Sequence, residues 1–198
     1  MYDKHNNVLC NRGGSDVERV TVRYENEDGT AHQVIYPPDV RNITLGDRHI
    51  RYIDLSALSS CTQLERLNLD HNKLETVDIS SLKSCKNLKG LNLWSNELTE
   101  IDLTPLASCK KLEYLILRKN WLESLDLSPL AACSQLNTLL LSLNALQRID
   151  LAPLASCTQL EHLRLYKNNI NKLNLSPLAF CTSLSDLHTD NEGGSTTR

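Results

Sequence analysis

Six of the seven cysteines recur at a constant interval, and thiols are the side chains here that could bind a metal or form disulfides. They lie 24 residues apart, at Cys61, Cys85, Cys109, Cys133, Cys157 and Cys181. A zinc site needs ligand pairs such as C-x-x-C that converge on one point, and the sequence contains no such pair. The interval instead predicts that each thiol fills the same small apolar position of a repeated unit. With Cys10 left over, we expect reduced thiols and a cytoplasmic protein.

A second column, of acidic residues, follows the same interval. It contains Asp54, Asp78, Asp102, Asp126 and Asp150, and Asn174 takes the sixth place. Stacked carboxylates could coordinate calcium. The alternative is that each side chain accepts hydrogen bonds from backbone amides at a turn, and an Asn in the sixth place fits this alternative better. We therefore favour the turn interpretation and expect no metal.

Catalytic motifs are not found in the sequence. The seven glycines form no phosphate-binding loop, the six histidines are scattered, and neither G-x-S-x-G nor H-E-x-x-H occurs. We expect a protein that is not an enzyme and holds no cofactor.

The elements that position these columns are copies of one unit of 24 residues. Leu112 to Gln135 reads LEYLILRKNWLESLDLSPLAACSQ, and related copies begin at Leu64, Leu88, Leu136 and Leu160. A looser copy begins at Val40 and a partial seventh at Leu184. Such a period is typical of a solenoid, in which each unit buries its apolar residues against its neighbours.

The shared frame L-x-x-L-x-L-x-x-N-x-L resembles the leucine-rich repeat superfamily over roughly residues 40–187. The resemblance implies an α/β fold, a right-handed solenoid with a concave parallel β-sheet and short convex helices or 3₁₀ turns. It implies no particular ligand, because the family includes receptors, inhibitors, adaptors and GTPase regulators.

The residues of one unit support the same arrangement. Alternation turns Leu115 and Leu117 to one face of an extended segment, and Tyr114 and Ile116 to the other. The Asn of the frame is expected to be buried at a turn, where it can satisfy backbone groups of neighbouring coils. Ser128-Pro129 predicts a short helix with Ser as N-cap and Pro at its first position.

The ends of the chain differ from the repeats. Val20, Val22 and Tyr24 alternate ahead of Asp28-Gly29, and a two-residue turn there would place Val22 opposite Ile35. We expect residues 1–39 to form a β-hairpin cap on the solenoid, although a separate binding role stays open. Residues 40–191 are the expected solenoid of six repeats plus a partial seventh, and residues 192–198 the flexible tail.

The net charge and the hydropathy of the chain argue against two classes of partner, nucleic acid and membrane. The net charge is −3 with no polybasic run, which argues against nucleic acid. No apolar stretch approaches the roughly 20 residues of a membrane span, and the polar start lacks the apolar core of a signal peptide. We expect a monomer that binds neither nucleic acid nor membrane.

The positions that vary between repeats face outward from the strands and carry four of the nine aromatic residues. Aromatic and Arg side chains dominate the hot spots of protein interfaces. Arg118 is placed to stack on Trp94, and Gly90 beside Tyr114 predicts a hollow for a partner side chain. The candidate binding residues are Trp94, Tyr114, Ile116, Arg118, Trp121, Leu140, Leu143, His162, Arg164 and Tyr166.

These observations predict a non-enzymatic protein-protein interaction scaffold that binds another protein on the concave face. Two alternatives stay open. The chain could regulate a small GTPase or phosphatase, or it could be the substrate-recognition part of a larger enzyme whose catalytic module is absent here.

Overall fold

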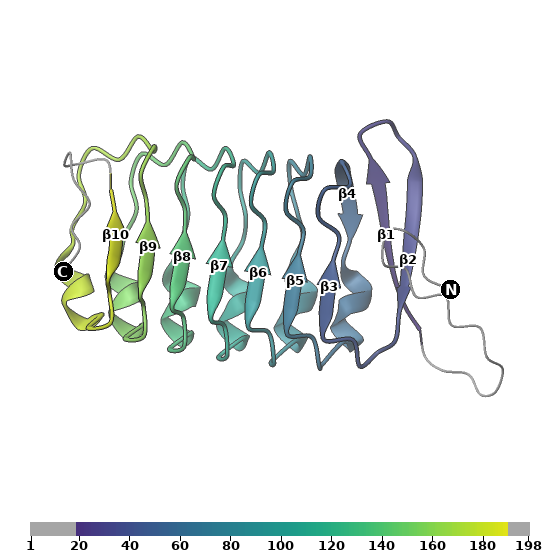
Figure 1. Cartoon of the computed structure of the whole chain (residues 1–198), viewed down its shortest axis with the longest axis horizontal. Coiled ribbons are helices and arrows are strands. Elements are labelled where there is room, and N and C mark those ends of the chain that lie inside the picture. The colour runs from purple at the N-terminus through teal and green to yellow at the C-terminus, as the bar shows by residue number, and fades with distance from the viewer. Residues whose placement is uncertain (1–18, 190–198) are drawn as a thin grey trace.

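Each repeat forms one coil of a solenoid, and the strands of successive coils pair in parallel, as the computed structural model shows for residues 19–189 (Figure 1). The sheet has seven strands in the order β10-β9-β8-β7-β6-β5-β3. They are β3 (Asn42–Thr44), β5 (Arg66–Asn68), β6 (Gly90–Asn92), β7 (Tyr114–Ile116), β8 (Thr138–Leu140), β9 (His162–Arg164) and β10 (Asp186–His188). Equivalent residues of adjacent coils lie opposite each other, as Leu91 and Leu115 do. The predicted solenoid is confirmed.

Short 3₁₀ helices line the other side of the solenoid (Figure 1). They are η1 (Ser56–Ser60), η2 (Ser80–Ser84), η3 (Thr104–Ser108), η4 (Ser128–Ala132), η5 (Ala152–Ser156) and η6 (Ser176–Phe180). A helix so short obtains little stability from its own hydrogen bonds, so packing against the neighbouring coils must hold each one in place.

The acidic column starts these helices. The amide of Ser128 donates a hydrogen bond to Asp126 Oδ1 at 2.8 Å, and the hydrogen bonds from Ser128 hold the pKa of Asp126 below its usual value. In the last repeat, Asn174 Oδ1 accepts the equivalent bond from Ser176 at 3.0 Å. The turn interpretation of the column is confirmed. The predicted Ser N-cap is wrong: the cap position is Leu127, without a side-chain bond, because the Asp two residues ahead of the helix already satisfies the first amide.

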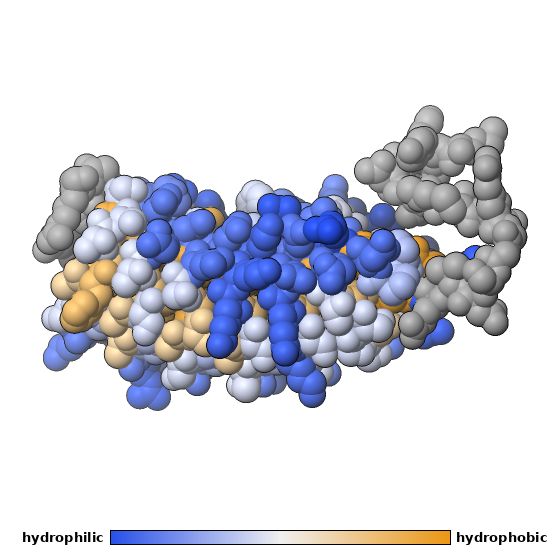
Figure 2. Space-filling view, turned by 90° about the horizontal axis from the view of Figure 1, so that it is seen from below, coloured by the Kyte–Doolittle hydropathy of each residue, from blue (hydrophilic) through white to orange (hydrophobic). Residues whose placement is uncertain are grey.

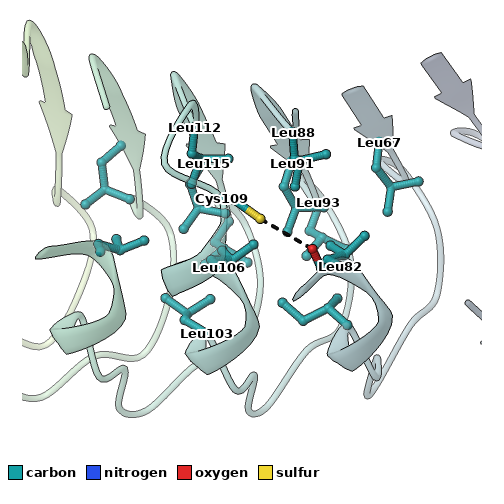
Figure 3. Close-up of a cluster of buried hydrophobic side chains, with 14 of the residues drawn as sticks. Leu67, Leu82, Leu88, Leu91, Leu93, Leu103, Leu106, Cys109, Leu112 and Leu115 are labelled. Atoms are coloured by element: carbon teal, nitrogen blue, oxygen red, sulfur yellow. Dashed lines mark hydrogen bonds between the residues drawn. The ribbon is translucent and has the colours of Figure 1, made fainter. Parts of the chain in front are cut away.

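The core lies between the sheet and the helices (Figure 3). Each apolar position of the repeat contributes one residue per coil, and these equivalent residues stack along the solenoid. Leu91, Leu106 and Leu115 are fully buried, as is Cys109. The thiol of Cys109 donates a hydrogen bond to the carbonyl of Leu82 in the preceding coil at 3.4 Å (Figure 3). All six cysteines of the column are buried and unpaired by disulfides, as predicted.

Burial also suppresses the reactivity of these thiols. It raises the pKa of Cys85 and Cys157 to about 12 and that of Cys109 and Cys133 to about 11. The thiolate is the reactive form, so very little of it is present at pH 8.

We expect native protein carrying Cys10→Ser, which leaves only the column, to react slowly with a chromogenic aromatic disulfide at pH 8. Six thiols should react rapidly once the protein is denatured, because unfolding restores an ordinary thiol pKa. The release of chromophore with time measures both rates. Rapid labelling of five or six thiols in native protein, or stoichiometric zinc, would contradict the packing role.

The Asn of each frame joins adjacent coils through its side chain, as predicted. Asn120 Nδ2 donates to the carbonyls of Leu93 and Leu117, both at 3.0 Å, and its Oδ1 accepts from the amide of Leu98 at 3.1 Å. The residue before it, Lys119, has φ of +58°, a left-handed conformation that the tight turn requires. The three hydrogen bonds of the Asn120 side chain are therefore all made to backbone groups that would otherwise be buried without these partners.

The predicted hairpin forms but with a different register. Strands β1 (Val20–Asn26) and β2 (Ala31–Tyr36) pair so that Val22 lies opposite Val34, not Ile35. The loop is one residue longer than expected, because Gly29 adopts φ of +81° and Asn26 bonds to Thr30 across three residues. Ile35 is consequently exposed.

The hairpin shares a sheet with the first coil. Strand β4 (Ile50–Asp54) pairs antiparallel with β1, giving the order β2-β1-β4. Val20, Val22 and Tyr24 are buried in the same core as the leucines of the repeats. The predicted tail at 192–198 and the first part of the predicted cap at 1–39 lie outside the described residues. Within residues 19–189, no helix combines the length and apolar character needed to cross a membrane.

Candidate protein-interaction surface

We call the side of the seven-stranded sheet that faces away from the 3₁₀ helices the concave face. Each strand there has three residues, of which the middle one points into the core and the other two point outward. Leu115 is thus buried between half-buried Tyr114 and Ile116, as the alternation predicted. The side chains of the outward columns can therefore vary between repeats without disturbing the core.

The centre of the concave face carries an apolar pair. Ile116 on β7 and Leu140 on β8 lie directly opposite each other in the parallel register, and both are half-buried. Leu143 is also half-buried and occupies the left-handed position of its turn, at φ of +60°. Trp121 lies beyond the end of β7 and is 58% exposed. These four candidate residues therefore leave apolar side-chain surface exposed to solvent.

Arg118 makes a different contact from the predicted one. Its guanidinium lies over the ring of Tyr166, 5.7 Å from the ring centroid, rather than on Trp94. Ser142 occupies the position between them in the same column and is fully buried, so its small side chain leaves room for Arg118 to extend across it. Trp94 instead contacts His71 edge to face, with ring centroids 4.4 Å apart. The outward-facing residues thus contact residues of other coils, and the partner of each one cannot be predicted from its position in the repeat alone.

Tyr114 covers Gly90, so the predicted hollow above this glycine is wrong. A Cβ built on Gly90 would overlap the Tyr114 ring, which means that the aromatic side chain already fills the space. Burial raises the pKa of the Tyr114 hydroxyl, and the hydrogen bond and charge of Arg66 partly oppose this shift. The glycine is thus required for the placement of Tyr114, not for access by a partner.

A hollow does exist beside Tyr114, on the side toward the hairpin. It has a volume of about 480 Å³ and crosses strands β3, β5, β6 and β7. Sequence reasoning missed most of its lining, although the small polar residues of the third and fifth columns in the first three repeats were a signal. Its outward-facing lining residues are Asn42, Thr44, Arg66, Asn68, Asn92, Tyr114 and Ile116.

A charged cluster forms around Asp186 at the other end of the sheet. Arg164 donates to Asp186 Oδ2 from Nε at 2.9 Å and Nη2 at 2.6 Å. His162 Nδ1 lies 3.3 Å from the same oxygen, and His188 Nε2 lies 2.8 Å from Oδ1. Burial acts to raise the pKa of Asp186, but the bond and charge of Arg164 and the two imidazoles outweigh it and lower this pKa. His162 and Arg164 therefore contact the partial seventh repeat through Asp186. Sequence reasoning had interpreted this repeat only as the end of the solenoid.

Comparisons with known proteins agree with this geometry. A profile described as "Leucine rich repeat" matches residues 62–122, and one described as "BspA type Leucine rich repeat region" matches residues 94–193. No curated protein gives a significant match.

Solved structures with a similar fold include two internalins from Listeria monocytogenes. An internalin, inlF, aligns with a TM-score of 0.61 and 28% identity over 77% of this chain and 41% of its own. Internalin C2 aligns with a TM-score of 0.61 and 26% identity over 77% of this chain and 62% of its own. The chain thus spans less than two thirds of either structure.

Proposed function

Because the chain belongs to the leucine-rich repeat family, we propose that it is a protein-interaction scaffold without catalytic activity that binds one partner protein across its concave face. We further propose that it acts as a monomer in the cytoplasm, where the free thiols of the cysteine column are compatible with a reducing environment.

One observation carries the proposal. Trp121, the Ile116–Leu140 pair and the Arg118–Tyr166 contact belong to the outward side of β7 to β9 or to its edge, and none of these residues is part of the hydrophobic core. Trp, Tyr and Arg supply most of the binding energy at known interfaces, in part because they bury much surface with few rotatable bonds. A face that gathers these residue types favours a protein partner over a small ligand.

We expect Trp121→Ala and Tyr114→Ala each to weaken partner binding by about 2 kcal/mol, or roughly 30-fold in Kd. The partner is first captured with the wild-type chain, and its affinity for each purified variant is then measured by surface plasmon resonance. Thermal melts of the same variants should be nearly unchanged.

The matched control is Tyr52→Ala, because Tyr52 is 63% exposed on strand β4, away from the concave face. This variant should bind normally. If it weakens binding as much as the two concave variants do, or if none of them has an effect, the partner does not bind across the concave face.

A further inference from the structure

The hollow beside Tyr114 differs in chemistry from the apolar centre of the concave face. Tyr114 and Ile116 form its boundary toward that centre, whereas most of the remaining lining consists of polar side chains from β3, β5 and β6. We call this site the Arg66 hollow. The inference below rests on the proposed function, since it concerns the chemistry of the partner bound on the same face.

Two amide side chains in the hollow can donate hydrogen bonds to a ligand. Asn68 Oδ1 accepts from the amide of Asp70 at 3.1 Å, and Asn92 Oδ1 accepts from the amide of Trp94 at 3.1 Å. Each oxygen thus bonds to the turn that follows its own strand, whereas the Nδ2 groups remain as donors. The two residues pair directly in the parallel register, on strands that lie about 4.8 Å apart.

Arg66 supplies the charge. Its side chain is exposed on β5, it interacts with the hydroxyl of Tyr114, and it forms no ion pair among residues 19–189. A guanidinium presents several donors in a fixed plane and binds a carboxylate through two parallel hydrogen bonds. An anionic group placed over Arg66, Asn68 and Asn92 could accept hydrogen bonds from three side chains, one of them positively charged.

The surrounding edge of the solenoid is basic. Lys86, Lys89, Lys110 and Lys111 lie in the turns that lead into β6 and β7, and Figure 2 shows hydrophilic residues gathered along the middle of the molecule in the view from below. This edge attracts negative charge toward the start of the strands, where Arg66 is located.

Two carboxylates near this edge already have partners within the protein. Glu65 is already held by Arg41 at 2.7 Å and Lys89 at 3.0 Å, and Asp70 lies 3.4 Å from His71. Glu113 is the one further carboxylate in the turns that carry the four lysines, so positive side chains outnumber negative ones there.

We infer that the Arg66 hollow binds an Asp or Glu side chain of an extended segment of the partner, whose neighbouring apolar residues pack on Ile116 and Leu140. The hollow has room for one or two side chains at about 480 Å³. The partner sequence is therefore expected to combine an acidic residue with an apolar or aromatic one a few positions away.

The test uses a phage-displayed library of random linear 12-residue peptides, selected on the full chain. Selected peptides should share an Asp or Glu at one position. For a synthetic peptide from the selection, Arg66→Gln in the protein and Glu→Gln in the peptide should each weaken binding at least 10-fold. Combining the two changes should weaken it little further, because both remove the same contact.

The matched control is Arg148→Gln, since Arg148 is an exposed Arg outside the concave strands. It should bind the peptide normally. Peptides that lose affinity with Trp121→Ala but show no acidic preference and no response to Arg66→Gln would overturn this inference and leave the proposed function standing. Peptides that respond to neither change, or a selection that enriches none, would count against both.

Discussion

Replacing Asn120 with alanine is expected to lower the free energy of unfolding by about 3 to 5 kcal/mol. The Asn120 side chain bonds to the carbonyls of Leu93 and Leu117 and the amide of Leu98, and all three groups are buried between coils. Each buried group left without a partner costs about 1 to 3 kcal/mol, partly offset where water can enter the space left by the side chain.

Denaturation in guanidinium chloride, followed by circular dichroism, measures the loss. Asn169→Ala is the matched control, since Asn169 lies on the surface of its turn and should change the free energy by less than about 0.5 kcal/mol. A loss below about 1 kcal/mol for Asn120→Ala would mean that the ladder of Asn side chains contributes little to the stacking of coils.

Val22→Asp is expected to destabilise the protein by about 3 to 5 kcal/mol, because it buries a carboxylate without a partner. Val22 is 0% exposed and belongs to the core that the hairpin shares with the first coil. The same substitution at Ile35, on the partner strand, should have a small effect because Ile35 is 47% exposed.

This pair of variants also tests the hairpin register. In the register predicted from a two-residue turn, Ile35 would face the core opposite Val22, and both substitutions would be severe. In the observed register Val34 takes that place. Thermal melts of the two variants distinguish the alternatives, and equal losses of stability would contradict the observed pairing.

The frame of the fold was predictable because it depends on residues that repeat. Leu115, Cys109 and Asn120 each have the same neighbours in every coil, so their spacing alone predicts burial and bonding. The hairpin was predictable as an element but not in its register, because one residue with a left-handed backbone, Gly29, changes the loop length. The helix cap was misassigned for a related reason: Asp126 and Ser128 are both good capping residues, and propensity does not rank them.

The concave face was less predictable, because its residues differ from coil to coil. Arg118 can extend past Ser142 to Tyr166 because the Ser142 side chain is small. The Tyr114 ring can pack over Gly90 because Gly90 has no side chain. The Arg66 hollow was not predicted, because a hollow depends on short side chains such as Asn68 and Thr44, whereas hot-spot residue types predict only where large side chains protrude. Such features depend on combinations of three or four side chains from different coils.

The constant register of the stack has a consequence for how recognition by this molecule can diversify. Because each coil bonds to the coil 24 residues away, a whole unit can be duplicated or lost without breaking the pattern of contacts inside the remaining coils. A unit duplicated between β5 and β7 would separate Arg66 from the Ile116–Leu140 pair by one further strand spacing, about 4.8 Å. An extended peptide advances about 3.3 Å per residue, so one strand spacing corresponds to one or two residues of a bound peptide. Gaining or losing one repeat would therefore change by one or two positions the distance between the acidic and the apolar residue that the partner must carry.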